Sequence, residues 1–139
     1  MTPAEWRAFL LAGSRTAKLA TVRRDGRPHV APVWFTLDGD DLVFMTMADT
    51  VKGRNLRSNP RVALSVDEER FPFAFVMVEG KAELLDLSPD ELLPYATRIA
   101  ERYVGAQRSD SFGRRNSVEG ELLVRVPLTR VVARKGVAS

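Results

Sequence analysis

The sequence predicts an antiparallel β-barrel or sandwich whose openings and edges are covered by two or three helices. Short runs rich in β-branched and aromatic residues recur along the chain. The early runs are joined by tight Asp/Gly turns, which suit antiparallel neighbours because parallel strands need long crossover connections. The clearest helix signal lies late in the chain, between Ser88 and Gly105. We therefore expect a mainly β fold with capping helices.

The first third of the chain predicts one helix followed by a three-stranded meander. Asp25-Gly26 is a strong two-residue hairpin signal, and a second Asp/Gly turn occupies residues 38–41. The helix is expected to place Trp6, Phe9 and Leu10 on one side. The expected elements are a helix over 3–11 and strands over 17–23, 29–37 and 41–48.

The middle of the chain predicts a short helix between two strands. Thr50 is a favourable N-cap for it, and Asn59-Pro60 ends it because the residue before proline is pushed out of the α region. A strand over 61–66 follows. The next apolar run, over 73–87, is long enough to bend at Gly80.

The last third contains the helix with the strongest boundary signals. Ser88 and Glu91 form a capping box, and Pro89 occupies the first helical position. Its apolar stripe consists of Leu92, Ala96, Ile99 and Tyr103. Residues 106–119 are polar and predict a loop, and residues 121–134 predict one bent strand or two short ones. We expect a single domain over residues 1–139.

Composition excludes several classes of protein. The 139 residues contain no cysteine, which rules out disulfides, cysteine metal sites and a cysteine nucleophile. The single histidine, His29, rules out a multi-histidine metal site within one chain and has no visible partner for catalysis. No apolar run approaches the roughly 18 residues of a membrane span. The first 20 residues lack a basic segment before their apolar stretch, so we do not expect them to be a secretory signal. A cytoplasmic protein without a metal or membrane partner is expected.

The charge balance is mildly basic. The formal net charge is +3, and all but four of the 21 basic residues are arginine. Arginine suits bidentate contacts with phosphates and carboxylates, but GC-rich coding alone also produces it. The basic residues are spread along the chain without a long basic run, so nucleic acid is an unlikely partner.

The stretch "ADTVKGRNLRSNPRVAL", residues 48–64, raises a question about charge. Lys52 and Arg54 fall in the first turn of the predicted helix, where the helix dipole disfavours cations. Either they form an ordinary solvated face, or they bind an anion at the helix end. Hydroxyls at Thr46 and Thr50 and the aromatic-rich "APVWF" of the neighbouring strand favour the second interpretation. Phosphate next to a flat apolar surface predicts a phosphorylated aromatic cofactor.

Three segments together resemble a known family. They are "LATVRRDGRPHVAPVWF", "LVFMTMADTVKGRNLRSNPRVAL" and "FVMVEGKAEL". This order resembles the pyridoxamine 5′-phosphate oxidase-like family and, more narrowly, its flavin/deazaflavin-dependent oxidoreductases that use coenzyme F-420. The resemblance extends over about residues 19–85 and includes the C-terminal strands only loosely. The resemblance implies an antiparallel, FMN-binding-like split β-barrel. It also implies a homodimer with two cofactor sites at the subunit interface.

The resemblance also implies which residues bind the cofactor. Lys52 corresponds to the lysine that holds the phosphate, and Phe73 to an aromatic residue that reaches the site from the second subunit. Thr50 stands where some relatives have an arginine. The implied cofactor-binding residues are Pro32, Val33, Trp34, Thr46, Ala48, Thr50, Lys52, Arg54, Asn55 and Phe73. The acidic tail of F-420 would suit Arg23, Arg24 and Arg27 of the hairpin.

The implied activity is hydride transfer from reduced F-420 to a conjugated small-molecule acceptor. An FMN-dependent enzyme of the same fold is the first alternative, because FMN also presents a phosphate and a flat tricyclic ring. A non-catalytic protein that binds F-420 or a tetrapyrrole is the second. The sequence identifies no catalytic side chain, since no residue in the matched motifs is compelled to act as the proton donor.

Overall fold

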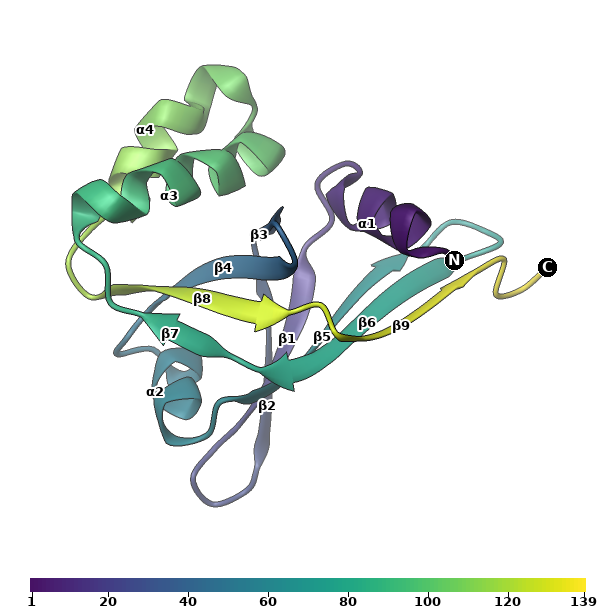
Figure 1. Ribbon diagram of the computed structural model, residues 1–139, viewed down its shortest axis with the longest axis horizontal. Coiled ribbons are helices and arrows are strands. Elements are labelled where there is room, and N and C mark those ends of the chain that lie inside the picture. The colour runs from purple at the N-terminus through teal and green to yellow at the C-terminus, as the bar shows by residue number, and fades with distance from the viewer.

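Two antiparallel sheets form the body of the protein, and four helices surround them (Figure 1). The computed structural model describes all 139 residues. The five-stranded sheet has the order β2-β1-β5-β6-β9, and the four-stranded sheet has the order β3-β4-β8-β7. The strands are β1 (Ala17–Val22), β2 (Pro28–Val33), β3 (Phe35–Asp38), β4 (Asp41–Met47), β5 (Arg61–Glu68), β6 (Ala74–Lys81), β7 (Glu83–Leu85), β8 (Glu121–Pro127) and β9 (Arg130–Lys135). The helices are α1 (Pro3–Leu11), α2 (Val51–Ser58), α3 (Pro89–Val104) and α4 (Ala106–Asn116).

The predicted meander is wrong in one respect, because its middle strand divides at Trp34. Residues before Trp34 form β2 in the five-stranded sheet, and residues after it form β3 in the four-stranded sheet. Val33 and Phe35, on either side of the break, are both buried. The break thus lets the chain change sheets at a corner while both flanking side chains stay in the core.

The same change of sheet occurs twice more. The predicted bend at Gly80 is wrong: Gly80 lies within β6 opposite Val62, and the break falls at Ala82. The Ala82 N–H donates to the Pro60 carbonyl at 2.7 Å, which fixes the crossing point between β6 and β7. Of the two predictions for residues 121–134, the pair of short strands is correct, and β8 and β9 again belong to different sheets.

Both early turns form where the sequence predicts them. Gly39 has φ of 58°, and the two-residue Gly39-Asp40 turn joins β3 to β4. The β1–β2 hairpin is longer than the expected two-residue form. The Gly26 N–H donates to the Arg23 carbonyl at 2.9 Å, the Arg23 N–H donates to the Arg27 carbonyl at 2.9 Å, and the strand pairing begins at Val22 and Pro28.

The main core lies between the two sheets. It is a cluster of 18 buried side chains in which Phe35 and Phe44 are the largest fully buried members. Helix α1 closes one edge of this core with Leu10, and Trp6 and Phe9 pack against the cluster as predicted. None of the four helices has the length and hydrophobicity needed to cross a membrane.

Helix α3 begins and ends as predicted, with a capping box between Ser88 and Glu91 and a C-cap at Gly105. The prediction of a loop over 106–119 is wrong, because residues 106–116 form α4. This segment has few large apolar side chains, so it lacks the stripe that identifies a helix. It packs instead by close approach: a Cβ at Gly113 would lie 2.2 Å from the Thr97 hydroxyl of α3.

Candidate functional site

The first turn of α2 is held directly against the end of β4. The Thr50 hydroxyl accepts the Gly53 N–H at 3.1 Å and donates to the Met47 carbonyl at 2.8 Å. It also lies 3.0 Å from the Thr46 hydroxyl. Thr50 is therefore the predicted N-cap, and the hydroxyls of both threonines serve this cap. A Cβ at Gly53 would lie 2.2 Å from the Met47 carbonyl, so only glycine allows so close an approach.

The start of α2 has unused capacity to bind an anion. No acidic residue occupies its first turn, and the backbone N–H groups of Val51 and Lys52 donate to no protein acceptor. Lys18 and Lys135 form ion pairs with carboxylates, whereas Lys52 forms none. Two free N–H groups and a free ammonium at a helix N-terminus are the donor set that a phosphate requires.

Lys52 lines a small cavity of about 240 Å³, which we call the Trp34 pocket. The pocket brings together four of the predicted cofactor-binding residues from β2, the following break and α2. Its lining residues are Pro32, Val33, Trp34, Met45, Lys52, Ala96, Ile99, Asn116 and Glu121. Helix α3 supplies Ala96 and Ile99, and α4 supplies Asn116. Helix α4, which the sequence did not predict, therefore forms part of the wall of the pocket.

The indole of Trp34 is fixed from one side. It stacks on Tyr103 of α3 with ring centroids 4.9 Å apart and an interplanar angle of 8°, and Phe112 of α4 lies 6.3 Å away. The Tyr103 hydroxyl donates to the Arg15 carbonyl at 3.0 Å and accepts the Phe35 N–H at 3.2 Å. Burial raises the pKa of Tyr103, so the phenol stays neutral. Trp34 is thus a rigid wall of the pocket.

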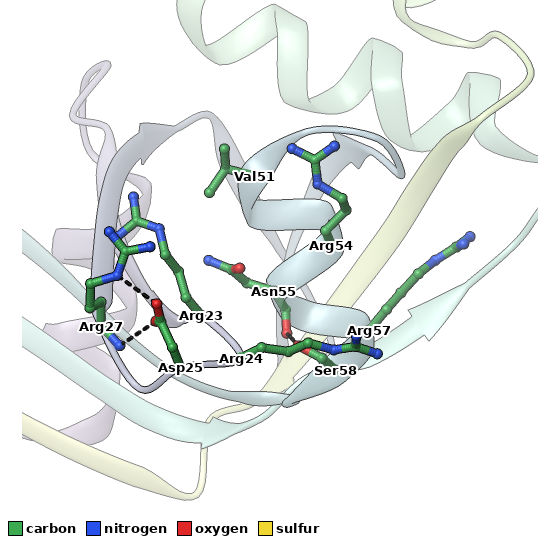
Figure 2. A pocket seen from close by; sticks show the side chains of 9 residues that line it. All are labelled: Arg23, Arg24, Asp25, Arg27, Val51, Arg54, Asn55, Arg57 and Ser58. Atoms are coloured by element: carbon green, nitrogen blue, oxygen red, sulfur yellow. Dashed lines mark hydrogen bonds and ion pairs between the residues drawn. The ribbon is translucent and has the colours of Figure 1, made fainter.

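Arg54 faces a second and larger cavity, of about 660 Å³, between α2 and the β1–β2 hairpin (Figure 2). We call it the arginine groove. Its lining residues are Arg23, Arg24, Asp25, Arg27, Val51, Arg54, Asn55, Arg57 and Ser58. The one carboxylate is already engaged, because Asp25 accepts from the Arg27 side chain at 2.8 Å. Hydrogen bonds from Arg27 lower the pKa of Asp25. Five arginines therefore line one groove, and its single carboxylate is already paired with Arg27.

Three other predicted residues lie on or beside α2 with structural contacts of their own. Asn55 is 6% exposed, and its amide donates to the Thr21 hydroxyl at 3.0 Å, which ties α2 to β1. The Ala48 N–H donates to the Gly120 carbonyl at 2.8 Å. Neither Ala48 nor Thr46 lines either cavity, although both adjoin the first turn of α2.

Phe73 lies away from the other predicted residues within one chain. It is in the β5–β6 connection, which Figure 1 shows beside the two termini, whereas α2 is at the other end of the molecule. Phe73 is 41% exposed, and its ring lies edge-on to that of Phe71 with ring centroids 6.1 Å apart. A contact between Phe73 and the Trp34 pocket therefore requires a second copy of the chain.

Glu121 is a site residue that the sequence did not reveal. It begins β8 opposite Met47, and its side chain lines the Trp34 pocket together with Lys52. Its Oε2 atom is buried without a hydrogen-bond partner. Burial raises the pKa of Glu121, while the positive charge of Lys52 acts in the opposite direction. No sequence signal identifies this pair, because 69 positions separate the two residues and only the fold brings them together.

Comparison with known proteins adds the family context. The family model described as pyridoxamine 5′-phosphate oxidase matches residues 2–123. A pyridoxine/pyridoxamine 5′-phosphate oxidase of Sphingopyxis alaskensis is 34% identical over 108 residues, which cover 77% of this chain and 49% of that protein. The chain thus spans about half the length of this curated relative.

Two solved structures share the fold over most of the chain. A conserved hypothetical protein from Mycobacterium tuberculosis is similar with a TM-score of 0.83 and 27% identity, covering 98% of this chain and 86% of that one. An F420 reductase is similar with a TM-score of 0.70 and 29% identity, covering 90% and 94% respectively. The fold is therefore that of pyridoxamine 5′-phosphate oxidase-like oxidoreductases. As residues 19–85 predict, the chain belongs to the pyridoxamine 5′-phosphate oxidase family of split β-barrels.

Proposed function

We propose that the protein is a coenzyme F-420-dependent oxidoreductase that reduces a conjugated small-molecule acceptor. The observation that carries the proposal is the pair of cavities on two sides of one helical turn. Lys52 lines the aromatic-walled Trp34 pocket, and Arg54 lines the strongly basic arginine groove. F-420 combines a phosphate and a flat ring with an acidic tail, and these two cavities complement all three parts.

Each group of residues in the two cavities then has a defined role in binding the cofactor. Lys52 and the free N–H groups of α2 bind the phosphate, because charge-assisted hydrogen bonds are the stronger class. Pro32, Val33 and Trp34 border the ring, and the arginines of the groove bind the carboxylates of the tail. The reduced deazaflavin would supply the hydride when it is bound. The protein would bind and orient this cofactor and exclude water from the site. The likeness to an F420 reductase supports this cofactor.

The alternative cofactor is FMN, which has the phosphate and the flat ring but no acidic tail. The family description and the curated relative support it. The arginine groove favours F-420, because FMN would leave its guanidinium groups without a partner. The third candidate, a non-catalytic binder of F-420 or a tetrapyrrole, is consistent with the absence of an obvious catalytic acid in the motifs.

The test compares F-420 and FMN binding to the wild type and to an Arg23→Gln/Arg54→Gln variant. We expect the variant to lose affinity for F-420, with a smaller dependence on salt, and to retain its affinity for FMN. Arg108→Gln is the matched control, since Arg108 is an exposed arginine of α4 that lines neither cavity. Equal affinity of the wild type and the double variant for F-420 would contradict the role of the groove, and tight binding of FMN alone would establish the alternative.

Turnover separates an enzyme from a binder. Reduced F-420 should be reoxidised faster with the protein and a quinone or conjugated carbonyl than with either alone. Binding without reoxidation across a broad panel of acceptors, including tetrapyrroles, would support the non-catalytic candidate instead.

We also propose that the functional unit is a homodimer. The outer face of the five-stranded sheet carries Met77 and Val132, which pair across β6 and β9 and are 42% and 48% exposed. Adjacent exposed apolar side chains on a sheet face favour association with a second copy. Such a dimer is also the arrangement that would give Phe73 a place in the site of its partner.

A further inference from the structure

The carboxyl group of Glu121 lines the Trp34 pocket, where its negative charge would repel an anion bound to Lys52. Glu121 and Lys52 line the same cavity of about 240 Å³. The backbone of Glu121 is fixed, because β8 pairs with β4 in continuous register from this residue onward and the Glu121 N–H donates to the Val118 carbonyl at 3.2 Å. The Oε2 atom is buried and makes no hydrogen bond. One oxygen of the carboxyl that lines the pocket therefore has unused hydrogen-bonding capacity.

The charges around Glu121 are few. From α2, Lys52 is the one cation that lines the pocket, and the remaining lining residues from β2, β4, α3 and α4 are uncharged. On its own strand, Arg125 lies four residues further along, but its guanidinium is bound to Asp38 at 2.6 Å and to Asp41 at 3.2 Å. Lys52 thus provides the nearby positive charge that favours the ionised form of Glu121, against the effect of burial on its pKa.

An anion that pairs with Lys52 changes this balance. It neutralises the cation that favours the ionised carboxyl, and it adds a like charge nearby. Both effects favour the protonated form of a buried carboxyl. A protonated Glu121 carries an O–H group, which donates a hydrogen bond instead of repelling the anion.

We propose that Glu121 couples anion binding in the Trp34 pocket to the uptake of one proton. The bound anion is phosphate-like, pairs with Lys52 and accepts a hydrogen bond from the protonated carboxyl; the proton comes from solvent and returns there when the anion leaves. This inference rests on the proposed function only in taking Lys52 as the phosphate-binding residue. The phosphate of a cofactor and free inorganic phosphate share the required chemistry.

The proposal predicts a specific pH dependence of binding. Where Glu121 is ionised in the free protein and protonated in the complex, the dissociation constant should rise by up to about tenfold per pH unit, which is the limit for one proton. Arginine and lysine side chains in general remain charged near neutral pH, so they do not produce this pH dependence of the dissociation constant.

Sulfate provides a test that is independent of any cofactor, because it remains a dianion across neutral pH. The titration of the Glu121 carboxyl is followed by carbon NMR in protein labelled at the glutamate side chains, with its signal assigned by its absence in Glu121→Gln. Sulfate is compared with chloride at matched ionic strength. We expect sulfate to raise the pKa of Glu121 and to leave that of Glu119, an exposed neighbour, unchanged. An unchanged pKa of Glu121 in sulfate would overturn the proposal.

A second arm uses F-420 and FMN as probes from pH 5.5 to 8.5. We expect the ratio of the dissociation constants of wild type and Glu121→Gln to change with pH, because Glu121 is present only in the wild type. Titration of the ligand itself affects both proteins equally and cancels in this ratio. Glu119→Gln should follow the wild type. Parallel curves for wild type and Glu121→Gln would overturn the coupling while leaving the proposed function intact. If sulfate raises the pKa of Glu121 but neither cofactor binds, the coupling stands and the proposed function fails.

Discussion

Trp34 and Tyr103 stack nearly parallel, with ring centroids 4.9 Å apart, across 69 residues of sequence. This contact joins the corner between the two sheets to the last turn of α3. The Tyr103 hydroxyl completes the junction, because it accepts the N–H of Phe35, the residue that follows Trp34. The wall of the Trp34 pocket thus depends on one aromatic side chain from a distant helix.

Tyr103→Phe should preserve the stacking on Trp34 and remove the hydrogen bonds of the Tyr103 hydroxyl. The Phe35 N–H and the Arg15 carbonyl then lose a partner, so we expect the free energy of unfolding to fall by about 1–3 kcal/mol. Urea denaturation measures this change. Tyr103→Leu removes the stack as well and should cost more. Equal stabilities of Tyr103→Phe and the wild type would show that water replaces the hydroxyl without loss.

Lys52→Ala should weaken binding of the cofactor by about 1.5–3 kcal/mol, the scale of a charge-assisted hydrogen bond. The apo-protein should be as stable or slightly more stable, because an unpaired cation at a helix N-terminus is unfavourable. Titration of F-420 and FMN and a thermal melt of the apo-protein measure the two effects. Lys81→Ala is a control for the loss of an exposed lysine. If Lys52→Ala binds both cofactors as the wild type does, Lys52 belongs to a solvated surface and the phosphate site is wrong.

Gly53→Ala should destabilise the protein, although alanine is the better helix former. The new Cβ would lie 2.2 Å from the Met47 carbonyl, so α2 must move away from β4. We expect a loss of about 1–3 kcal/mol, as for overpacked sites, measured by denaturant unfolding. Gly80→Ala is the matched comparison, because its nearest contact would be at 3.4 Å. A Gly53→Ala protein of wild-type stability would indicate that α2 is free to shift.

Met77→Lys should shift the protein from dimer to monomer. Met77 is 42% exposed and lies opposite Val132, so a lysine there would place a charge within the proposed interface. Light scattering of the wild type should give twice the chain mass of 15.5 kDa at micromolar concentration, and the variant should give the monomer mass. A wild-type monomer would contradict the dimer and any role for Phe73 in a partner's site.

Much of the local structure follows from the sequence alone. Thr50 and Ser88 cap the starts of their helices, because each side-chain oxygen accepts a backbone N–H from the first turn. This interaction involves only residues that are close in sequence. Asp/Gly residues specify the early turns through their own backbone preferences. The unfavourable position of Lys52 in the first turn of α2 is likewise visible in the sequence, and so is the family resemblance that assigns it to a phosphate.

Only the tertiary structure decides which of these residues meet. The chain changes sheets at Trp34 and Ala82. At Trp34 no local signal marks the break, because Val33 and Phe35 on either side are both apolar. Helix α4 is stabilised by the close approach of Gly113 to Thr97, which a search for apolar periodicity cannot detect. The Asn55 amide, predicted to contact the cofactor, donates to the Thr21 hydroxyl, and Glu121 of β8 lines the same pocket as Lys52. Such contacts depend on the packing of distant segments, whereas caps and turns depend on the residues next to them.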